Sequence, residues 1–308
     1  MKTRAFQILT LLDLSATSGA VLPIARDLAR RKRARLLFLH ALGNPENQNL
    51  GALPAEISVD RRDREQALTG LIEQFLGPGL DWETAVVTGD PVEEAVRLVR
   101  ERQVDLVIAA SFGLSGLKRL LVGKVVENLA RLLPCPLLIT PPPKRARRRG
   151  PSRDGPFFQR LAVGLGDPSR EAALLESALS LPGETLQEIF LLHCLETPPD
   201  FDGAPRTQLS YSRYQQQTLD KIAADLGQAP RPGFFGAAKA TPVLLTGPPG
   251  EAILDFAATH ELDLIAVGVK DRSRFEKMFL GSTTETVIRG ATCPVLVGPV
   301  EARGRAGP

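Results

Sequence analysis

An internal repeat constrains the fold of this chain more than any other feature of its sequence. Two apolar blocks, VDLVIAA at 104–110 and LDLIAVG at 262–268, lie 158 residues apart, and CPLLIT at 135 precedes CPVLVG at 293 by the same distance. TGDPVEEA at 88 and TGPPGEAI at 246 keep this separation as well. Nearer the start, LLFLH at 36–40 and IFLLH at 189–193 are 153 residues apart, so the second copy carries five additional residues after this block. Because about 150 residues is a usual domain size, the 308 residues predict two domains of one fold.

Within each copy, short apolar runs bounded by turns alternate with longer segments of helical period. This pattern is typical of βαβ units around a parallel sheet. For the first copy it predicts strands near 6–12, 35–41, 82–87, 104–110 and 136–140, and helices near 17–32, 60–76, 91–102 and 124–132. The second copy repeats that order. Right-handed crossovers then give a doubly wound α/β sheet in each copy, whose ligand crevice lies beyond the carboxyl ends of the strands.

A short basic segment separates the two copies. Residues 144–149 read KRARRR and stand between three prolines and the stretch GPSRDGP. Prolines, glycines and like charges together cannot form a packed core, so we expect a linker over 144–156. The predicted domains are 1–143 and 157–300, followed by a disordered tail over 301–308. The basic run has no interleaved aromatic residue, and we do not expect it to bind nucleic acid.

The composition is that of a globular protein of the reducing cytoplasm. Apolar residues make up 43% and charged residues 24%, the net charge is +3, and no apolar run approaches the roughly 18 residues of a membrane span. The apolar start is interrupted by Gln7 and Asp13, which argues against a signal peptide. The three cysteines show neither disulfide pairing nor metal-ligand spacing. We therefore predict a cytoplasmic protein with no membrane contact and no metal site of its own.

Two segments resemble a known family. AASFGLSGLKRLLVGKVVENLARLLPCPLLIT at 109–140 and AVGVKDRSRFEKMFLGSTTETVIRGATCPVLVG at 266–298 are similar to the C-terminal part of universal stress protein domains. That pattern has a glycine after strand four, a second three residues later and, after nine more, a Gly-Ser or Gly-Thr pair that opens the last helix. The chain thus resembles a tandem universal stress protein, which implies two Rossmann-like domains. In nucleotide-binding members, an aspartate ending strand one holds the adenosine and the end of strand two contacts the adenine.

For the first copy, the resemblance implies a site for an adenine nucleotide, namely ATP alone or with Mg²⁺. Glycines let backbone N–H groups approach phosphates closely, and a helix N-terminus offers free donors and a positive dipole. Two residues depart from the pattern. Ala110 adds a methyl group, and Lys124 replaces a hydroxyl by a cation that can meet a phosphate. The expected site residues of the first copy are Asp13, Ala41, Ala110, Gly113, Gly123 and Lys124.

The second copy keeps less of the pattern. Gly166 stands at the position of the strand-one aspartate, and Asp271 replaces the second glycine. A carboxylate in a phosphate-binding loop repels the ligand unless Mg²⁺ bridges the two. We therefore expect a degenerate site here, made of Gly268, Asp271, Gly281 and Ser282.

Structural roles compete with ligand binding for several of these residues. Ser282-Thr283-Thr284-Glu285 fits a capping box, in which the serine caps the helix and the glutamate reaches back. Asp13 would cap a helix that begins near residues 15–18. Three isolated histidines without partner spacing are expected in structural roles, namely His40, His193 and His260.

The sequence contains no pattern for an enzyme. Gly123-Lys124 lacks the upstream glycine of a phosphate-binding P-loop, because Lys118 stands there, and the GxSxG and HExxH patterns are absent. We predict a non-enzymatic stress-response protein that binds ATP in its first copy. Two alternatives stay open, an interaction protein without nucleotide and a slow ATPase. The resemblance also implies that the two copies pair through their apolar last strands, and a homodimer is compatible with the sequence.

Overall fold

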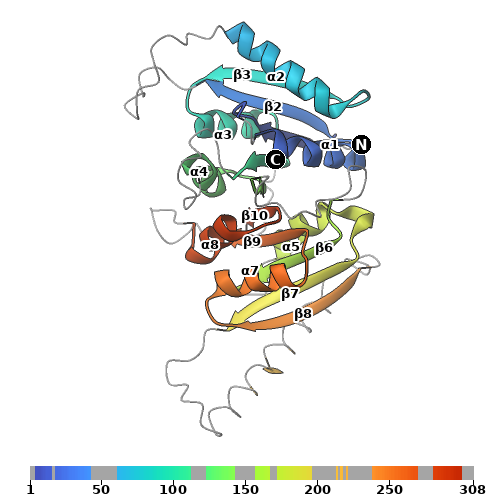
Figure 1. Ribbon diagram of the computed structural model, residues 1–308, viewed down its shortest axis with the longest axis vertical. Helices are drawn as coiled ribbons and strands as arrows, with labels where there is room; N and C mark the ends of the chain where they lie inside the picture. The colour runs from blue at the N-terminus through green and yellow to red at the C-terminus, as the bar shows by residue number, and fades with distance from the viewer. Residues whose placement is uncertain are drawn as a thin grey trace, which may run out of the picture. The chain divides into compact units, whose positions relative to one another are not determined.

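The two sequence repeats fold as separate units, Met1–Ala146 (unit 1) and Arg147–Pro308 (unit 2). Figure 1 shows the computed structural model, with unit 1 in blue to green and unit 2 in yellow-green to red. It describes residues 4–15, 18–42, 61–111, 123–142, 157–166, 172–195, 238–269 and 280–299, together with residues 213, 216, 217 and 220. The division falls inside the segment expected to be a linker. The linker 144–156 and the tail 301–308 lie outside the described residues, so these two assignments stay predictions.

Unit 1 alternates strands and helices in the order expected from its sequence. Its elements are β1 (Gln7–Leu11), the 3₁₀ turn η1 (Ser18–Val21), α1 (Leu22–Lys32), β2 (Arg35–Leu42), α2 (Arg61–Leu76), β3 (Trp82–Thr88), α3 (Pro91–Glu101), β4 (Leu106–Ala110), α4 (Lys124–Leu132) and β5 (Leu137–Thr140). One helix differs from its prediction, because the segment 17–32 begins with the 3₁₀ turn. Pro23, in the first turn of α1, has no N–H to donate backward, so the preceding residues close with the tighter turn.

The sheet of unit 1 has the strand order β3-β2-β1-β4-β5, with every neighbouring pair parallel. On its two sides, Ile8 of β1 lies in register with Leu36 and Leu106. Helix α1 contacts α2, and α3 contacts α4. Right-handed crossovers place these two helix pairs on opposite faces of the sheet, which makes the unit doubly wound.

The central strands are apolar because both faces of a parallel sheet are covered by helices. Ile8, Leu36, Phe38 and Val107 are fully buried. The only tryptophan of the chain, Trp82, packs edge-on against Phe38, with ring centroids 6.4 Å apart. Its fluorescence therefore reports on the folding of unit 1.

The start of α3 shows how a local motif sets an element boundary. The Asp90 carboxylate accepts hydrogen bonds from the backbone N–H groups of Val92 and Glu93, at 2.8 and 3.0 Å, and Pro91 occupies the first helical position. Both features favour a helix N-terminus. In unit 2 the same position is Pro248, and among the described residues no side chain caps the helix that follows it.

Unit 2 repeats the order of unit 1. Its described elements are β6 (Arg160–Leu165), α5 (Ala172–Ser180), the 3₁₀ turn η4 (Gly183–Thr185), β7 (Glu188–Leu195), β8 (Lys239–Thr246), α7 (Pro249–Thr259), β9 (Leu264–Val269), α8 (Ser282–Gly290) and β10 (Val295–Pro299). The strand order is β10-β9-β6-β7-β8, again parallel throughout. The helix expected between β7 and β8 falls on residues 196–237, nearly all of which lie outside the described part of the chain.

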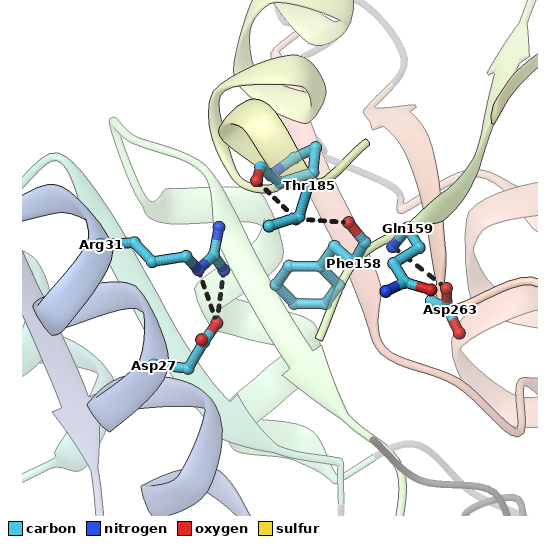
Figure 2. Close-up of polar contacts among 7 residues, drawn as sticks. Asp27, Arg31, Phe158, Gln159, Thr185 and Asp263 are labelled. Carbon is cyan, nitrogen blue, oxygen red and sulfur yellow. Dashed lines mark hydrogen bonds and ion pairs between the residues drawn. The ribbon is translucent and has the colours of Figure 1, made fainter. Parts of the chain in front are cut away.

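A carboxylate fixes the amino end of the central strand in both units. In unit 1, Asp105 accepts a hydrogen bond from the Gln7 backbone N–H at 2.8 Å. In unit 2, Asp263 accepts from the backbone N–H groups of Gln159 and Arg160, at 3.1 and 2.9 Å. Figure 2 shows the Gln159 contact, beside the Thr185 hydroxyl that donates to the Phe158 carbonyl at 3.1 Å. These paired aspartates explain why the VDL and LDL blocks recur.

Two glycines allow close packing of α7 against α8. A Cβ atom at Gly250 would lie 2.6 Å from the Thr286 Cβ, and one at Gly290 would lie 2.3 Å from the Leu254 Cδ1. Non-bonded carbon atoms do not approach so closely. These helices can therefore lie this close together only because both positions lack a side chain. No helix in the described part of the chain is long and apolar enough to cross a membrane.

Candidate functional site

The topology of unit 1 predicts where a ligand would bind. The chain leaves β1 toward β2 on one side and leaves β4 toward β5 on the other, so the strand order changes direction between β1 and β4. In open parallel sheets, ligands bind in the crevice beyond the carboxyl ends of the strands at such a point. Asp13 follows β1 and Ser111 follows β4, so these two residues lie at the sheet edge where the topology predicts a crevice.

Asp13 stands where the sequence resemblance expects the adenosine-binding carboxylate. The register Leu11 to Leu39, continued by two residues, places Asp13 beside Ala41. Its Oδ1 accepts a hydrogen bond from the Ser15 backbone N–H at 3.0 Å, and Leu14 between them has a positive φ of 56°. Oδ2 makes no hydrogen bond with a described residue. The half-buried carboxylate thus closes a tight turn and keeps one oxygen for another partner.

The alternative role for Asp13, as the N-cap of the first helix, does not fit α1. The N-cap of α1 is Val21, and among the described residues no side chain caps it. The local turn at Ser15 needs only one acceptor oxygen, which either aspartate or asparagine supplies. The turn alone therefore does not explain the negative charge at this strand end.

A histidine beside the crevice supports the strand end. The buried His40 donates a hydrogen bond from Nδ1 to the Leu12 carbonyl at 2.8 Å, next to Asp13. His193 makes the same contact with the Leu165 carbonyl at 2.9 Å in unit 2. His260 stacks on Phe256 with ring centroids 3.9 Å apart. The structural roles expected for the three histidines are confirmed by these contacts.

Helix α4 points an uncapped N-terminus toward the end of β4. The Gly123 backbone N–H donates to the Ser111 carbonyl at 3.4 Å, and Gly123 then begins the helix as its N-cap, with no side-chain cap from a described residue. The N–H groups of the first turn consequently lack intrahelical partners and carry a positive partial charge. Lys124, the first helical residue, is exposed and adds a full positive charge. A cation here is unfavourable for the helix alone and favourable for binding an anion.

Ser111 is a polar residue of this region that sequence reasoning did not single out. Its side chain is 2% exposed, and its hydroxyl has no hydrogen-bond partner among the described residues. Its backbone N–H donates to the Thr140 carbonyl of β5 at 2.9 Å, which fixes its position. The sequence feature that could have singled out Ser111 is its position directly after the wholly apolar run VIAA, where the strand reaches the carboxyl edge of the sheet.

Unit 2 differs from unit 1 in the polar groups near its strand ends. Thr284, in the first turn of α8, donates from its hydroxyl to the Gly268 carbonyl at 2.8 Å. Unit 1 has Val126 at the equivalent place, which cannot donate. At the position of Asp13, unit 2 has the exposed Gly166. This unit therefore presents fewer free polar groups at its strand ends.

The capping box proposed for α8 is wrong. The N-cap is Gly281, with a positive φ of 64°, and Ser282 is the first helical residue. The Glu285 side chain forms an ion pair with Arg289 instead of reaching back to the cap. The positive φ of Gly281 favours glycine over serine, so the N-cap lies one residue earlier than the sequence pattern predicts.

Two expected site residues lie outside the described residues, Gly113 and Asp271. The others lie near the carboxyl edge of the sheet in their own unit, and they form two sets. The first consists of Asp13, Ala41, Ala110, Gly123 and Lys124, and the second of Gly268, Gly281 and Ser282. Among the described residues, no group of three or more histidine, cysteine, aspartate or glutamate side chains can hold a metal ion.

Comparison with known proteins agrees with this architecture. The model of the universal stress protein family matches residues 6–141 and 157–299. The chain belongs to the universal stress protein family. The universal stress protein YxiE of Bacillus subtilis is 27% identical over an alignment of 144 residues that covers 43% of this chain and 97% of YxiE. The family domain therefore occurs twice here.

Solved structures of family members match either nearly the whole chain or about half of it. A universal stress protein from Archaeoglobus fulgidus matches with a TM-score of 0.66 and 21% identity over 95% of this chain and 96% of its own. Another universal stress protein, determined in complex with cAMP, is 25% identical and covers 44% of this chain and 97% of its own, with a TM-score of 0.35. The first of these shows that the two-domain Rossmann-like fold occurs in a single family chain.

Proposed function

We propose that this universal stress protein binds an adenine nucleotide, ATP alone or with Mg²⁺, at the carboxyl edge of the unit 1 sheet. The observation that carries the proposal is that the Asp13 carboxylate, after β1, and the uncapped start of α4, after β4, lie at the same edge of the sheet, where the strand order changes direction. Asp13 offers acceptor oxygens suited to ribose hydroxyls. The first turn of α4 and Lys124 offer donors and positive charge suited to phosphates.

The same argument assigns unit 2 a lapsed site. Gly166 has no carboxylate for a ribose, and Asp271 stands where the family pattern has its second glycine, so its negative charge would repel a phosphate. We propose that unit 2 contributes to the fold and to domain pairing without binding nucleotide.

A second candidate function is an interaction protein that binds no nucleotide in either unit. It is favoured by Ala110 and Lys124, which both depart from the family pattern, and by the Asp13 carboxylate, which already closes its own turn. Both candidates describe a protein without turnover, and among the described residues no general base is identified beside Gly123. A slow ATPase would need one.

The test is isothermal titration of the full chain with Mg-ATP, beside the variant Asp13→Ala. We expect one equivalent bound by the natural chain and an affinity at least about tenfold lower for the variant, since a hydrogen bond to a charged group contributes about 1.5–3 kcal/mol. Asp255→Ala is the matched control, because it removes the same charge from an exposed position on α7. Release of inorganic phosphate is followed in the same samples.

Thermal unfolding followed by Trp82 emission provides a second readout. ATP at about 100 times its Kd stabilises the binding unit by about 2.7 kcal/mol, so the unit 1 transition rises. If millimolar ATP gives neither heat nor a shift of this transition, the nucleotide site is refuted and the interaction protein becomes the working description. Binding that survives Asp13→Ala would place the nucleotide elsewhere in the chain.

A further inference from the structure

The end of helix α1 carries a dense group of positive charges. Residues 30–35 read RRKRAR, so every residue of this segment except Ala34 is basic. Two of these cations bind carboxylates. Arg31 forms an ion pair with Asp27, as Figure 2 shows, and Arg35 forms ion pairs with two carboxylates at the start of β3. The cations that form no ion pair with a described residue are Arg30, Lys32 and Arg33.

Unit 2 shows that this fold can be built without these charges. The separation of 153 residues between the copies matches 30–35 to 183–188, which read GETLQE. This segment leads into β7 as 30–35 leads into β2, yet it has two glutamates and no basic residue. The fold therefore does not require a cation at this place, and a role specific to unit 1 is left to explain the basic segment.

The charges are in part unfavourable for unit 1 itself. One cation at a helix C-terminus is stabilising, but the helix dipole supplies only about half a unit of negative charge there. Burial and, next, the charge of Arg31 lower the pKa of Lys32, which lies over the Phe6 ring at 4.8 Å from its centroid. Arg33, the C-cap of α1, has a positive φ of 49°, a conformation that favours glycine. Helix stability therefore does not account for the arginine at position 33.

An exposed aromatic side chain lies at the same end of the α1–α2 pair. Phe75, in the last turn of α2, is 37% exposed. The Arg26 guanidinium of α1 donates to its backbone carbonyl at 3.2 Å. Arg30 lies one turn further along α1, on the same face, and its Nη2 is 3.9 Å from the place of a Cβ on Gly77. Arg33 follows after three residues, so cations and an apolar ring share one surface.

We infer that this surface, made of Arg30, Arg33 and Phe75, binds an acidic peptide segment of a partner protein, one that also carries an apolar side chain. A guanidinium presents two parallel N–H donors, which suit a carboxylate. The Phe75 ring would be covered by the apolar side chain. Because Arg33 directly precedes β2, the surface lies at the amino edge of the sheet, opposite to the proposed nucleotide site. The inference therefore does not depend on nucleotide binding.

Negative charges around the surface favour a peptide over a nucleic acid. Glu73 is exposed two residues before Phe75, and the Asp81 side chain, which borders the start of β2 and pairs with Arg35, is 71% exposed. A nucleic-acid strand carries a phosphate every few ångströms and would have to pass these carboxylates. A short acidic segment can place its carboxylates on the two arginines alone.

The test measures fluorescence anisotropy of a fluorescein-labelled peptide with the repeat Glu-Asp-Leu, added to the full chain without nucleotide. The control peptide has the repeat Gln-Asn-Leu. We expect Arg30→Gln and Arg33→Gln each to weaken binding of the acidic peptide by about three- to fivefold, and the double variant by about tenfold or more. Phe75→Ser should also weaken it. Raising the salt from 0.1 to 1 M should weaken binding further, because the Debye length falls from about 10 to about 3 Å.

Arg100→Gln is the matched control variant. Arg100 is an exposed arginine in the last turn of α3, so it has the same charge and the same place in a helix as Arg30, on another helix of unit 1. This variant should bind the acidic peptide within about twofold of the natural chain.

Arg33→Gly separates binding from stability. Glycine adopts the positive φ of this position without strain, so the Trp82 unfolding transition should rise by about 2–4 °C while peptide binding weakens. A fall of this transition would show that the Arg33 charge stabilises the helix, and would overturn the argument that the charge has another purpose.

Other outcomes would also overturn the inference. Equal affinity of the natural chain and the double variant, or equal loss in Arg100→Gln, would show that the α1 arginines are not the binding groups. Equal binding of the Gln-Asn-Leu peptide would show that carboxylates are not recognised. Tighter binding of single-stranded polyuridylate than of the acidic peptide, lost in the double variant, would assign the surface to nucleic acid. None of these results changes the ATP titration, so the nucleotide proposal stands or falls separately.

Discussion

The packing of α7 against α8 predicts that a glycine-to-alanine substitution in α7 lowers the free energy of unfolding, which is opposite to the usual effect of this change in a helix. Replacing glycine by alanine inside a helix normally stabilises a protein by about 0.5–1 kcal/mol. At Gly250 the new methyl carbon would lie 2.6 Å from the Thr286 Cβ and 2.7 Å from its Cγ2. The Cβ atom is fixed by the backbone and cannot turn away. The helices must therefore separate, at a cost of about 1–3 kcal/mol for an overpacked core.

The expected net effect of Gly250→Ala is a loss of about 1 kcal/mol. For a protein of this size, that loss lowers Tm by about 2–4 °C. Urea denaturation followed by far-ultraviolet circular dichroism measures the free energy of unfolding directly. The dichroism signal is used because Trp82 reports on unit 1 only.

Two other glycines make the comparison quantitative. At Gly290 the new methyl would meet the Leu254 Cδ1 at 2.3 Å, but that atom ends a flexible side chain that can rotate aside. At Gly70 of α2, nothing lies within 4 Å. The variants should therefore rank in stability as Gly70→Ala above the natural chain, then Gly290→Ala, then Gly250→Ala. A Gly250→Ala variant as stable as the natural chain would refute the reasoning about fixed and movable atoms.

Three further predictions concern single side chains. His40→Ala leaves the Leu12 carbonyl without its 2.8 Å hydrogen-bond partner, and should lower the free energy of unfolding by about 1–3 kcal/mol. Urea denaturation followed by Trp82 emission measures this loss, and an unchanged midpoint would show that the contact is not stabilising. Asp263→Ala removes an acceptor of two backbone N–H groups and should cost about 2–3 kcal/mol by dichroism, whereas alanine at the exposed Asp255 should cost less than about 0.5 kcal/mol. Burial raises the pKa of the Cys194 thiol from 9.0 to about 11, so its thiolate fraction at pH 8 falls by about a hundredfold. Alkylation of Cys194 by iodoacetamide, followed by peptide mass spectrometry, should slow accordingly in the folded chain and recover in urea; equal rates would contradict the burial argument.

The elements of unit 1 could be predicted from the sequence because their signals are local. Apolar runs bounded by turns gave each strand to within two residues, and Asp90-Pro91 marked the start of α3. The repeat then carried these assignments to unit 2. The 3₁₀ turn before α1 was missed because it depends on the backbone geometry around Pro23, which an apolar pattern does not encode.

The candidate site could be predicted only in part. Asp13 and Gly123 were found through motif positions, and the structure places both at the same sheet edge. Ser111 was missed because a single serine has no periodicity, and its lack of a partner is visible only once the fold is known. The capping box at Ser282 failed because the positive φ of Gly281 is a property of the folded backbone.

The central position of β1 in its sheet has a consequence for synthesis on the ribosome. This strand is made first, yet its second neighbour, β4, follows only after a separation of 98 residues, as between Gln7 and Asp105. At about 5–20 residues per second, the nascent chain waits about 5–20 s before β1 can pair on both sides. During that delay, one edge of an apolar strand stays open to wrong partners, which makes chaperone contact most valuable early in translation. Since β4 and β5 precede residue 147, unit 1 can close before unit 2 leaves the ribosome.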